Sequence, residues 1–201
     1  MKMINRIIEP TSGNTGVGLA IVAAQRGYRC IFVMSDKMSP EKVALLRAYG
    51  AEVVVCPTAV PPEHPDSYYS VADRLTRETP NSFRPDQYSN PNNPIEHERS
   101  TGPEIWEQTE GRITHFVAGL GTGGTITGVG QVLKERKPTV QIVAVEPENA
   151  SLLAGKPFSP HKIQGWTPDF VPKVLNRSVA DHLMTVSDVE AITTARALAS
   201  Q

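Results

Sequence analysis

Residues 7–25, IIEPTSGNTGVGLAIVAAQ, indicate the fold class most directly. The stretch passes from an apolar strand end, Ile7-Ile8, into a polar, glycine-bearing turn at residues 11–16. It then enters a run from Val17 to Gln25 that is apolar nearly all round, which is typical of a helix buried between a sheet and its neighbours. A strand, a tight turn and a buried helix in that order predict the first unit of a parallel, helix-covered sheet.

The next elements continue the alternation of strand and helix. Residues 30–34 and 52–56 are short, β-branched runs that predict strands. Between them, Ser39-Pro40 supplies an N-cap and a proline for the first turn of a helix. Residues 7–56 therefore predict half of a doubly wound domain.

A loop dense in proline and asparagine, Pro80 to Pro94, predicts the crossing between two domains. Beyond it the βαβ pattern returns, with helices expected near residues 102–109 and 126–134, strands at 115–120, 141–145 and 183–186, and a last helix opened by a capping box at 187–190. We expect an α/β fold of two doubly wound, three-layer α/β/α domains with mostly parallel sheets, both incomplete. Residues 1–90 would form the smaller domain and residues 91–201 the larger.

Composition limits the class of partner. The 201 residues carry 20 Lys and Arg against 21 Asp and Glu, without a basic run, so neither nucleic acid nor a membrane surface is indicated. No stretch reaches the roughly 18 apolar residues of a membrane span, and the N-terminus lacks the apolar core of a signal peptide, so we expect a cytoplasmic protein. Cys30 and Cys56 lie in apolar runs typical of buried thiols, and we expect no metal site.

The turn Gly119-Leu-Gly121-Thr-Gly123-Gly124-Thr125 lies between an expected strand and an expected helix. Peptide N–H groups of such a turn and of the first helical turn converge on one cup that favours phosphate. The glycines let the backbone approach the oxygens, and the hydroxyls of Thr122, Thr125 and Thr127 can add donors.

The same turn has a second interpretation. Gly119, Gly121 and Gly124 satisfy the spacing G-x-G-x-x-G, and Glu146 ends the following strand where an acid that binds ribose would lie. A nicotinamide-dependent oxidoreductase, using NAD or NADP, is therefore an alternative that this motif alone does not separate from a phosphate cup.

A second anion site follows the first strand, at Thr11-Ser12-Gly13-Asn14-Thr15-Gly16. The segment offers the donors that a carboxylate needs: N–H groups at a helix N-terminus, hydroxyl groups and an asparagine amide. A simple N-cap requires only one such residue, so six consecutive small or polar residues favour a binding loop.

Three ordered motifs carry a family resemblance: Glu9 to Gly16, Gln87 to Pro94 and Gly121 to Thr125. In this order and spacing they resemble the β-family, or fold type II, of pyridoxal-phosphate enzymes, whose members include cystathionine β-synthase and cysteine synthase. The likeness runs from about Ile8 to the last helix. It implies the fold of the tryptophan synthase β-subunit and pyridoxal 5′-phosphate as cofactor.

The resemblance also implies roles for individual residues. The substrate carboxylate would be held by the first loop together with a glutamine: Thr11, Ser12, Gly13, Asn14, Thr15 and Gln87. Asn14 would also bond the phenolic oxygen of the cofactor. The 5′-phosphate would be held by the glycine-rich turn: Gly121, Thr122, Gly123, Gly124 and Thr125. Gly165 would line the mouth of the site, where Thr167 replaces the family's next glycine and Trp166 lies beside it.

The reaction that the resemblance implies is β-replacement on serine or O-acetylserine, in the biosynthesis of cysteine or cystathionine. Residues 27–75 are more similar to cystathionine β-synthases and residues 143–175 to cysteine synthases, so both remain open, with a slight preference for the former. The substrate is a small amino acid, and intact members of the family would be homodimers.

The family's Schiff-base lysine precedes the first loop in a Ser-x-Lys-Asp setting, which neither Lys2 nor Lys37 reproduces. We therefore assign no catalytic residue, expect a chain truncated at both ends, and expect little or no activity from these 201 residues alone. A non-catalytic remnant that keeps the binding loops is the remaining alternative.

Overall fold

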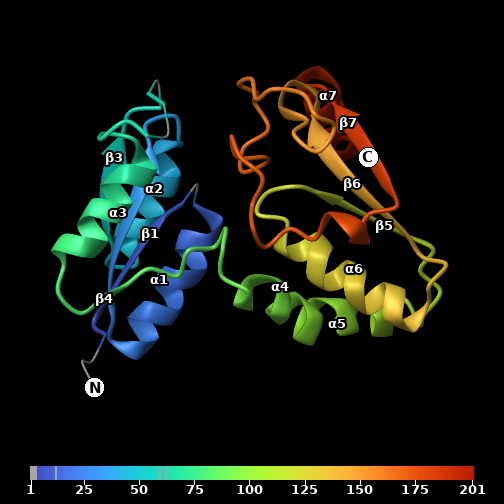
Figure 1. Ribbon diagram of the computed structural model, residues 1–201, viewed down its shortest axis with the longest axis horizontal. Coiled ribbons are helices and arrows are strands. Elements are labelled where there is room, and N and C mark those ends of the chain that lie inside the picture. The colour runs from blue at the N-terminus through green and yellow to red at the C-terminus, as the bar shows by residue number, and fades with distance from the viewer. Residues whose placement is uncertain (1–3, 12, 59, 62) are drawn as a thin grey trace. The chain divides into compact units, whose positions relative to one another are not determined.

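The computed structural model describes residues 4–11, 13–58, 60–61 and 63–201 (Figure 1). The chain forms two compact units, Met1–Asp86 and Gln87–Gln201, which we call unit 1 and unit 2. The sequence placed the domain boundary after residue 90, whereas the compact units divide between Asp86 and Gln87, so Gln87 belongs to unit 2. Each unit has its own sheet and its own apolar core.

Unit 1 contains a parallel sheet of four strands in the order β3-β2-β1-β4. The strands are β1 (Arg6–Pro10), β2 (Arg29–Ser35), β3 (Glu52–Cys56) and the short β4 (Ser82–Phe83). The chain moves outward from β1 to β3 and returns on the other side of β1 as β4. This reversal makes the carboxyl end of β1 a topological switch point, where open α/β sheets bind their ligands.

Helices cover both faces of this sheet. Helices α1 (Asn14–Arg26) and α2 (Pro40–Ala48) pack on the face that presents Phe32 and Met34, while α3 (Tyr68–Glu78) packs on the face that presents Val33 (Figure 1). All three of these β2 side chains have no exposed surface. Because successive side chains of a strand point to opposite faces, one strand joins both halves of the core. Unit 1 is thus a three-layer α/β/α structure.

Unit 2 contains the parallel sheet β5-β6-β7. Its strands are β5 (His115–Gly119), β6 (Gln141–Pro147) and β7 (His182–Val186), and single 3₁₀ turns occupy Glu148–Ala150 and Arg177–Val179. Helices α5 (Gly102–Gln108) and α6 (Gly124–Arg136) pack on one face, around Leu133 and Ile142. The predicted α/β fold with parallel sheets is confirmed.

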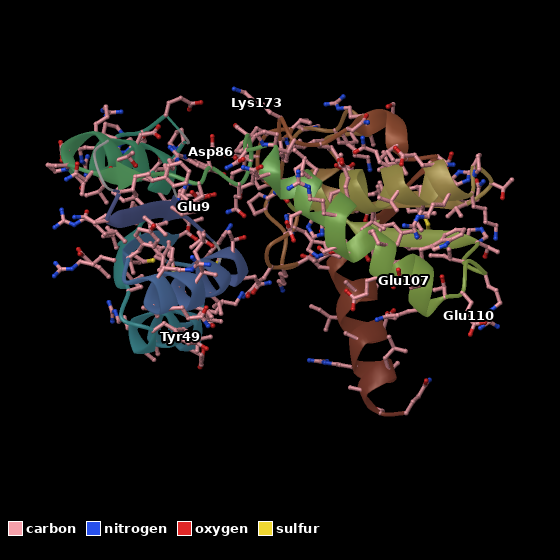
Figure 2. The ribbon with its side chains drawn as sticks, turned by 90° about the horizontal axis from the view of Figure 1, so that it is seen from below. Glu9, Tyr49, Asp86, Glu107, Glu110 and Lys173 are labelled. Atoms are coloured by element: carbon pink, nitrogen blue, oxygen red, sulfur yellow. The ribbon has the colours of Figure 1, made fainter. Side chains whose placement is uncertain are left out.

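The last helix, α7 (Asp188–Ala199), begins with the predicted capping box, in which Ser187 and Glu190 bond each other's backbone N–H groups. None of its residues is buried, and Figure 2 shows α7, drawn in dark red, extending away from the sheet of unit 2. In the described residues, the sheet of unit 2 therefore has helical cover on one face only.

The structure departs from the sequence prediction between residues 92 and 101. Where we expected loop up to Pro94, a short helix α4 (Asn92–Glu96) runs into a π-helical turn, η1 (His97–Thr101). Pro94 is compatible with this helix because the N–H groups of a first helical turn have no acceptor within the helix.

Two further sequence expectations concern burial. Cys30 and Cys56 are buried free thiols, as predicted, and burial raises the pKa of each. None of the helices among the described residues is long and apolar enough to cross a membrane.

Candidate functional site

The carboxylate loop of unit 1 is organised by Thr11. This residue directly follows β1 and is buried, and its Oγ1 accepts hydrogen bonds from the N–H groups of Gly13 and Gly16, each at 3.1 Å. The threonine hydroxyl thus folds the loop back over the start of α1. Ser12 lies outside the described residues.

Helix α1 begins directly after this turn. Its N-cap is Gly13, which makes no side-chain cap, and its first turn holds no acidic residue. Asn14 and Thr15, the first two helical residues, are exposed. A helix N-terminus without a competing carboxylate is a favourable place for an anion.

Two glycines in this loop are required by its geometry. Gly13 has φ of +124°, which side chains rarely tolerate, and a Cβ at Gly16 would lie 2.8 Å from Cγ2 of Thr11. The side chain of Lys42, in α2, lies over Gly13, since its Cδ would be 3.0 Å from a Cβ there. An ammonium group is therefore carried on a stem that contacts the predicted carboxylate loop.

A buried carboxylate marks the switch point itself. Glu9, on β1, has no exposed surface, and its Oε2 accepts the N–H of Asp86 at 2.8 Å (Figure 2). This bond ties the segment that follows β4 to the carboxyl end of β1. The end of unit 1 is thereby fixed beside the loop that begins at Thr11.

The glycine-rich turn of unit 2 connects β5 to α6, as predicted. Gly123 is the N-cap of α6 in a left-handed conformation, with φ of 82°, and makes no side-chain cap. The first turn of α6 holds no acidic residue, whereas Lys134 and Arg136 lie in the last turn. Because no acidic side chain in the first turn repels an anion, the N-terminus of this helix is favourable for anion binding.

The glycines of this turn lie too close to neighbouring atoms to be replaced by residues with a side chain. A Cβ at Gly121 would lie 2.9 Å from the carbonyl oxygen of Gly165, and one at Gly123 would lie 2.7 Å from Cδ1 of Leu175. The structure therefore brings the predicted mouth residue Gly165 to the predicted phosphate residue Gly121. A backbone cradle of this kind fits a phosphate group.

Two threonine hydroxyls of the turn are held by side chains from α4 and η1. Oγ1 of Thr122 accepts Nδ2 of Asn93 at 2.9 Å and the N–H of Gly124 at 3.2 Å. Oγ1 of Thr125 lies 3.1 Å from Nε2 of His97. Thr127 differs from the sequence expectation, because it is buried and accepts the N–H of Asn176 at 2.9 Å, so it holds a loop instead.

The mouth segment contains a residue in an unusual conformation. Thr167, which the resemblance matches to a glycine of the family, is buried with φ of 31°, and both its N–H and its hydroxyl donate to the carbonyl of Leu120. Trp166 covers Gly119 so closely that a Cβ there would lie 2.1 Å from the indole ring. The residues that depart from the family pattern therefore pack directly against the end of β5 and the turn that follows it.

Glu146 does not act as a free acid for a ribose. It is 1 % exposed, and its two carboxylate oxygens accept the N–H of Leu153 at 3.1 and 3.2 Å. Burial raises the pKa of Glu146, and the backbone N–H groups oppose that shift. Since this carboxylate is committed to the loop after β6, the nicotinamide alternative loses the acid on which it depended.

Gln87 is half-buried at the start of unit 2, and its carbonyl oxygen accepts Nδ2 of Asn93 at 2.9 Å. Its predicted contact with the substrate carboxylate stays a prediction. The amide of Asn93 thus links the backbone of Gln87 to the hydroxyl of Thr122.

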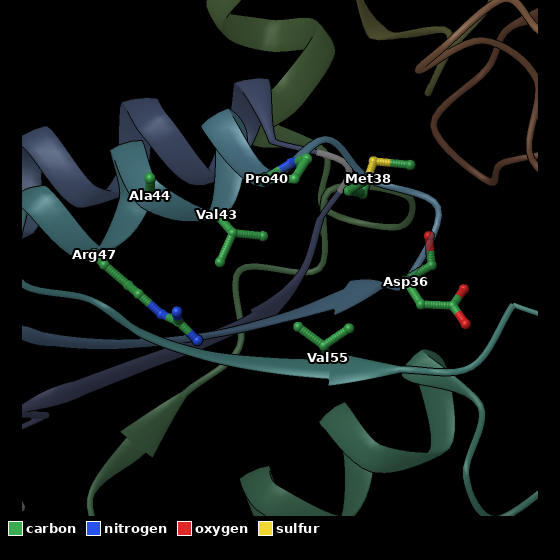
Figure 3. Close-up of a pocket in the computed structure, with 8 residues that line it drawn as sticks. Asp36, Met38, Pro40, Val43, Ala44, Arg47 and Val55 are labelled. Carbon is green, nitrogen blue, oxygen red and sulfur yellow. The ribbon is translucent and has the colours of Figure 1, made fainter.

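Unit 1 also has an open hollow beneath α2 (Figure 3). Its walls come from α2 and from the ends of β2 and β3: Ser35, Asp36, Met38, Pro40, Val43, Ala44, Arg47 and Val55. None of the predicted site residues that the structure describes lines it. We therefore base the candidate site on the two loops, whose donors suit anionic groups, and not on this hollow.

Fold and loops together define a class: an α/β protein in which a strand of each parallel sheet leads through a glycine-containing loop into a helix without an acidic residue in its first turn. A family model described as pyridoxal-phosphate dependent enzyme matches residues 2–201, and the chain belongs to that family. The predicted family and its cofactor, pyridoxal phosphate, are therefore confirmed.

Two curated proteins that are similar to the chain are both cystathionine β-synthases. The chain is 47 % identical over 199 residues to the cystathionine β-synthase of Apis mellifera and 48 % identical over 200 residues to that of Oryctolagus cuniculus. Each alignment covers 97 % of the chain but only 40 % and 36 % of the relative. The chain thus spans well under half the length of these curated relatives.

Two solved structures are similar throughout the chain. An O-ureido-L-serine synthase has a TM-score of 0.91 at 46 % identity, over 100 % of this chain and 62 % of that protein. A hydrogen sulfide-producing enzyme from Fusobacterium nucleatum has a TM-score of 0.92 at 36 % identity, over 98 % and 66 %. These likenesses confirm fold type II.

Three residues that contact the two loops were not predicted from the sequence: Lys42, Asn93 and His97. Lys42 follows a proline and a glutamate in a first helical turn, where an ordinary surface lysine is expected. Asn93 and His97 contact partners 29 and 28 residues away, and local pattern does not encode such pairs. The one available signal was the polar string before Pro94, which we interpreted as a loop.

Proposed function

We propose that this chain is the binding part of an enzyme that catalyses pyridoxal-phosphate-dependent β-replacement on serine or O-acetylserine. In unit 2, Gly121 to Thr125 would hold the 5′-phosphate with backbone N–H groups and two hydroxyls. When bound, the cofactor supplies an electron sink for negative charge that develops at the substrate Cα. The single observation that supports this proposal most strongly is the close-packed, glycine-rich turn at the N-terminus of α6, whose threonine hydroxyls contact Asn93 and His97.

In unit 1, the start of α1 would hold the substrate carboxylate. Gly13, Asn14 and Thr15 present a helix N-terminus, and Thr11 keeps the loop folded through its two N–H contacts. Ser12 is proposed to add a donor to the same group, and the role of Gln87 in binding the substrate carboxylate stays a prediction from the resemblance. Lys42 would add a positive charge near the loop, which favours a carboxylate over a neutral group.

Among reactions of this class we favour one like that of cystathionine β-synthase. The support is the 46–48 % identity to three proteins of that name. A cysteine synthase-like reaction is the second candidate, because residues 143–175 are more similar to that group. We also propose a homodimer as the form of the intact enzyme and the cytoplasm as its location.

A titration tests the proposed cofactor site. The 201-residue polypeptide is expected to bind pyridoxal 5′-phosphate and to bind NAD at least tenfold more weakly, measured by calorimetry at matched pH and salt. Thr122→Val and Thr125→Val should each weaken binding of the phosphate ester by about tenfold, the loss of one hydrogen bond to a charged group. Equal or tighter binding of NAD would refute the proposal.

A second titration tests the carboxylate loop. Serine should bind the polypeptide more tightly than serinamide, which lacks the carboxylate, and Asn14→Ala should reduce that preference. Gly18→Ala, farther along α1 at a site with open space around it, is the matched control and should leave the preference unchanged. A preference for serine that survives Asn14→Ala would place the carboxylate elsewhere.

A third test concerns chemistry. The polypeptide has no lysine in a Ser-x-Lys-Asp setting. After incubation with pyridoxal phosphate and reduction with borohydride, mass spectrometry should therefore find no stoichiometric pyridoxyl-lysine. A single stoichiometric adduct, for example at Lys42, would contradict this expectation and would identify the lysine that forms the Schiff base.

A further inference from the structure

The hydroxyls of Thr122 and Thr125 in the proposed phosphate cup are held in position by hydrogen bonds to two side chains from one helix face. Asn93, in α4, and His97, the first residue of η1, are four residues apart and so lie on the same side of a helix. Asn93 contacts Thr122 and His97 contacts Thr125, at 2.9 and 3.1 Å. We call these two residues the Asn93/His97 face.

On Thr122 the contacts determine what the hydroxyl can still do. Its oxygen accepts two N–H groups, one from Asn93 and one from Gly124. A hydroxyl has two lone pairs and one hydrogen, so its remaining capacity is to donate. The orientation of the amide is fixed as well, because Nδ2 of Asn93 also donates to the carbonyl of Gln87, which can only accept.

On Thr125 the histidine ring has the corresponding effect. Nδ1 of His97 lies 3.0 Å from Oγ1 of Thr101, and Nε2 lies 3.1 Å from Oγ1 of Thr125. Burial lowers the pKa of His97, so at neutral pH the ring carries one donor and one acceptor nitrogen. With the proton on Nε2, the ring donates to Thr125 and accepts from Thr101, and the hydroxyl hydrogen of Thr125 can turn to a ligand.

Close packing keeps this face at a fixed distance from α6. A Cβ at Gly124 would lie 1.9 Å from Oδ1 of Asn93, and one at Gly128 would lie 2.2 Å from the carbonyl oxygen of Pro94 and 2.7 Å from Cβ of His97. Because these two glycines permit backbone contact, the side chains of α4 and η1 reach the cup directly. Short π-helical turns such as η1 are frequent at functional sites.

We propose that the Asn93/His97 face is a positioning layer which orients both cup hydroxyls as donors to a phosphate ester. Asn93 sets the hydroxyl of Thr122, and His97, as the Nε2–H tautomer, sets that of Thr125. The inference rests on the proposed phosphate cup and goes beyond it by naming residues that do not touch the ligand.

The test compares pyridoxal 5′-phosphate with pyridoxal, which lacks the phosphate, as ligands of the full 201-residue chain. Asn93→Ala and His97→Leu should each weaken binding of the phosphate ester by about tenfold and leave pyridoxal unaffected. His97→Gln keeps an N–H donor and should restore most of the affinity. Ser100→Ala is the matched control, since this exposed hydroxyl of η1 donates to the carbonyl of Glu96 at the end of α4.

A double-variant cycle separates positioning from general damage. If His97 acts through Thr125, adding His97→Leu to Thr125→Val should cost little beyond Thr125→Val alone. Only variants whose thermal unfolding is cooperative enter the comparison. Nitrogen NMR of the histidine rings in the unmodified chain gives a measurement that needs no variant, and pyridoxal 5′-phosphate should shift His97 toward the Nε2–H tautomer.

These experiments can reject the positioning role of the Asn93/His97 face separately from the phosphate cup. Loss of affinity in the threonine variants without loss in Asn93→Ala and His97→Leu, or losses that add fully in the cycle, would overturn the positioning layer and leave the cup in place. An unmodified chain that binds the phosphate ester no better than pyridoxal would overturn the cup and the layer together.

Discussion

At the scale of single residues, the backbone of Thr167 is the clearest anomaly. A φ of 31° is uncommon for any residue other than glycine and more so for a β-branched one. Such strain persists where the surroundings hold the residue, and here its N–H and hydroxyl both donate to the carbonyl of Leu120. Compared with a glycine at this position, Thr167 thus adds the hydrogen bond of its hydroxyl but has a strained backbone.

This balance predicts different results for two substitutions. Thr167→Gly relieves the strain and should leave the free energy of unfolding within about 1 kcal/mol of the original, since glycine also loses more entropy on folding. Both variants lose the hydroxyl, but Thr167→Ala also keeps the strain, so it should cost about 1 kcal/mol more than Thr167→Gly. Urea unfolding of the three proteins measures both differences. If the alanine variant is as stable as the glycine variant, the backbone conformation at position 167 is not strained.

At the scale of helices and strands, the contact of α6 with α4 and η1 depends on glycine. Gly128→Ala places a methyl group against the carbonyl of Pro94, and we expect a loss of about 1–3 kcal/mol, as for other overpacked contacts. Gly18→Ala, in α1, meets nothing within 4 Å and should instead stabilise by up to about 1 kcal/mol through helix propensity. Thermal and urea unfolding should show a lower free energy of unfolding for Gly128→Ala and a higher one for Gly18→Ala. A change in the same direction for both variants would contradict this packing.

A second element-scale contact joins α6 to the edge of the sheet in unit 2. Nζ of Lys134 lies 2.8 and 2.7 Å from the two carboxylate oxygens of Asp181, one of which also accepts the N–H of Ile142 at 2.7 Å. The hydrogen bond from Lys134, followed by that from Ile142, lowers the pKa of Asp181 from its ordinary value of 3.8. Folding therefore favours the ionised carboxylate.

The sign of the pH dependence follows from this shift. A carboxyl group whose pKa is lower in the folded state contributes stability above its unfolded value, here 3.8, and loses it as pH falls through the lower folded pKa. Asp181→Asn should therefore be less stable than the original chain at neutral pH, and the difference should close below pH 3.8. Denaturant unfolding at a series of pH values measures it. A difference that is independent of pH would mean that the charge of Asp181 does not matter.

The elements were largely predictable because their signals are local. Strand β3 has the predicted bounds, and the capping box at Ser187 opens α7 where the sequence placed it. Helix α4 was missed because Pro91 and Pro94 suggested a loop, although proline is compatible with a first helical turn. The roles of Asn93 and His97 depend on contacts with residues almost thirty positions away, which only the folded chain reveals.

At the scale of the whole molecule, the account is that each unit presents one helix N-terminus to one anionic group. Both α1 and α6 begin after a parallel strand, at a glycine with positive φ, and without an acid in the first turn. The sequence alone suggested both loops and the kind of anion that each favours, and the family resemblance assigned these anions to the cofactor and the substrate. What the sequence left open was the choice between phosphate cup and dinucleotide fold, which the burial of Glu146 and the family match resolve.

The most direct test of this account is a backbone amide NMR titration of the 201-residue chain with pyridoxal 5′-phosphate. The account predicts that the largest shifts fall on the amides of residues 121–125, and that pyridoxal without phosphate leaves those amides in place. Shifts confined to the α2 hollow or to other parts of the chain, or equal shifts with both ligands, would contradict a phosphate cup at the N-terminus of α6.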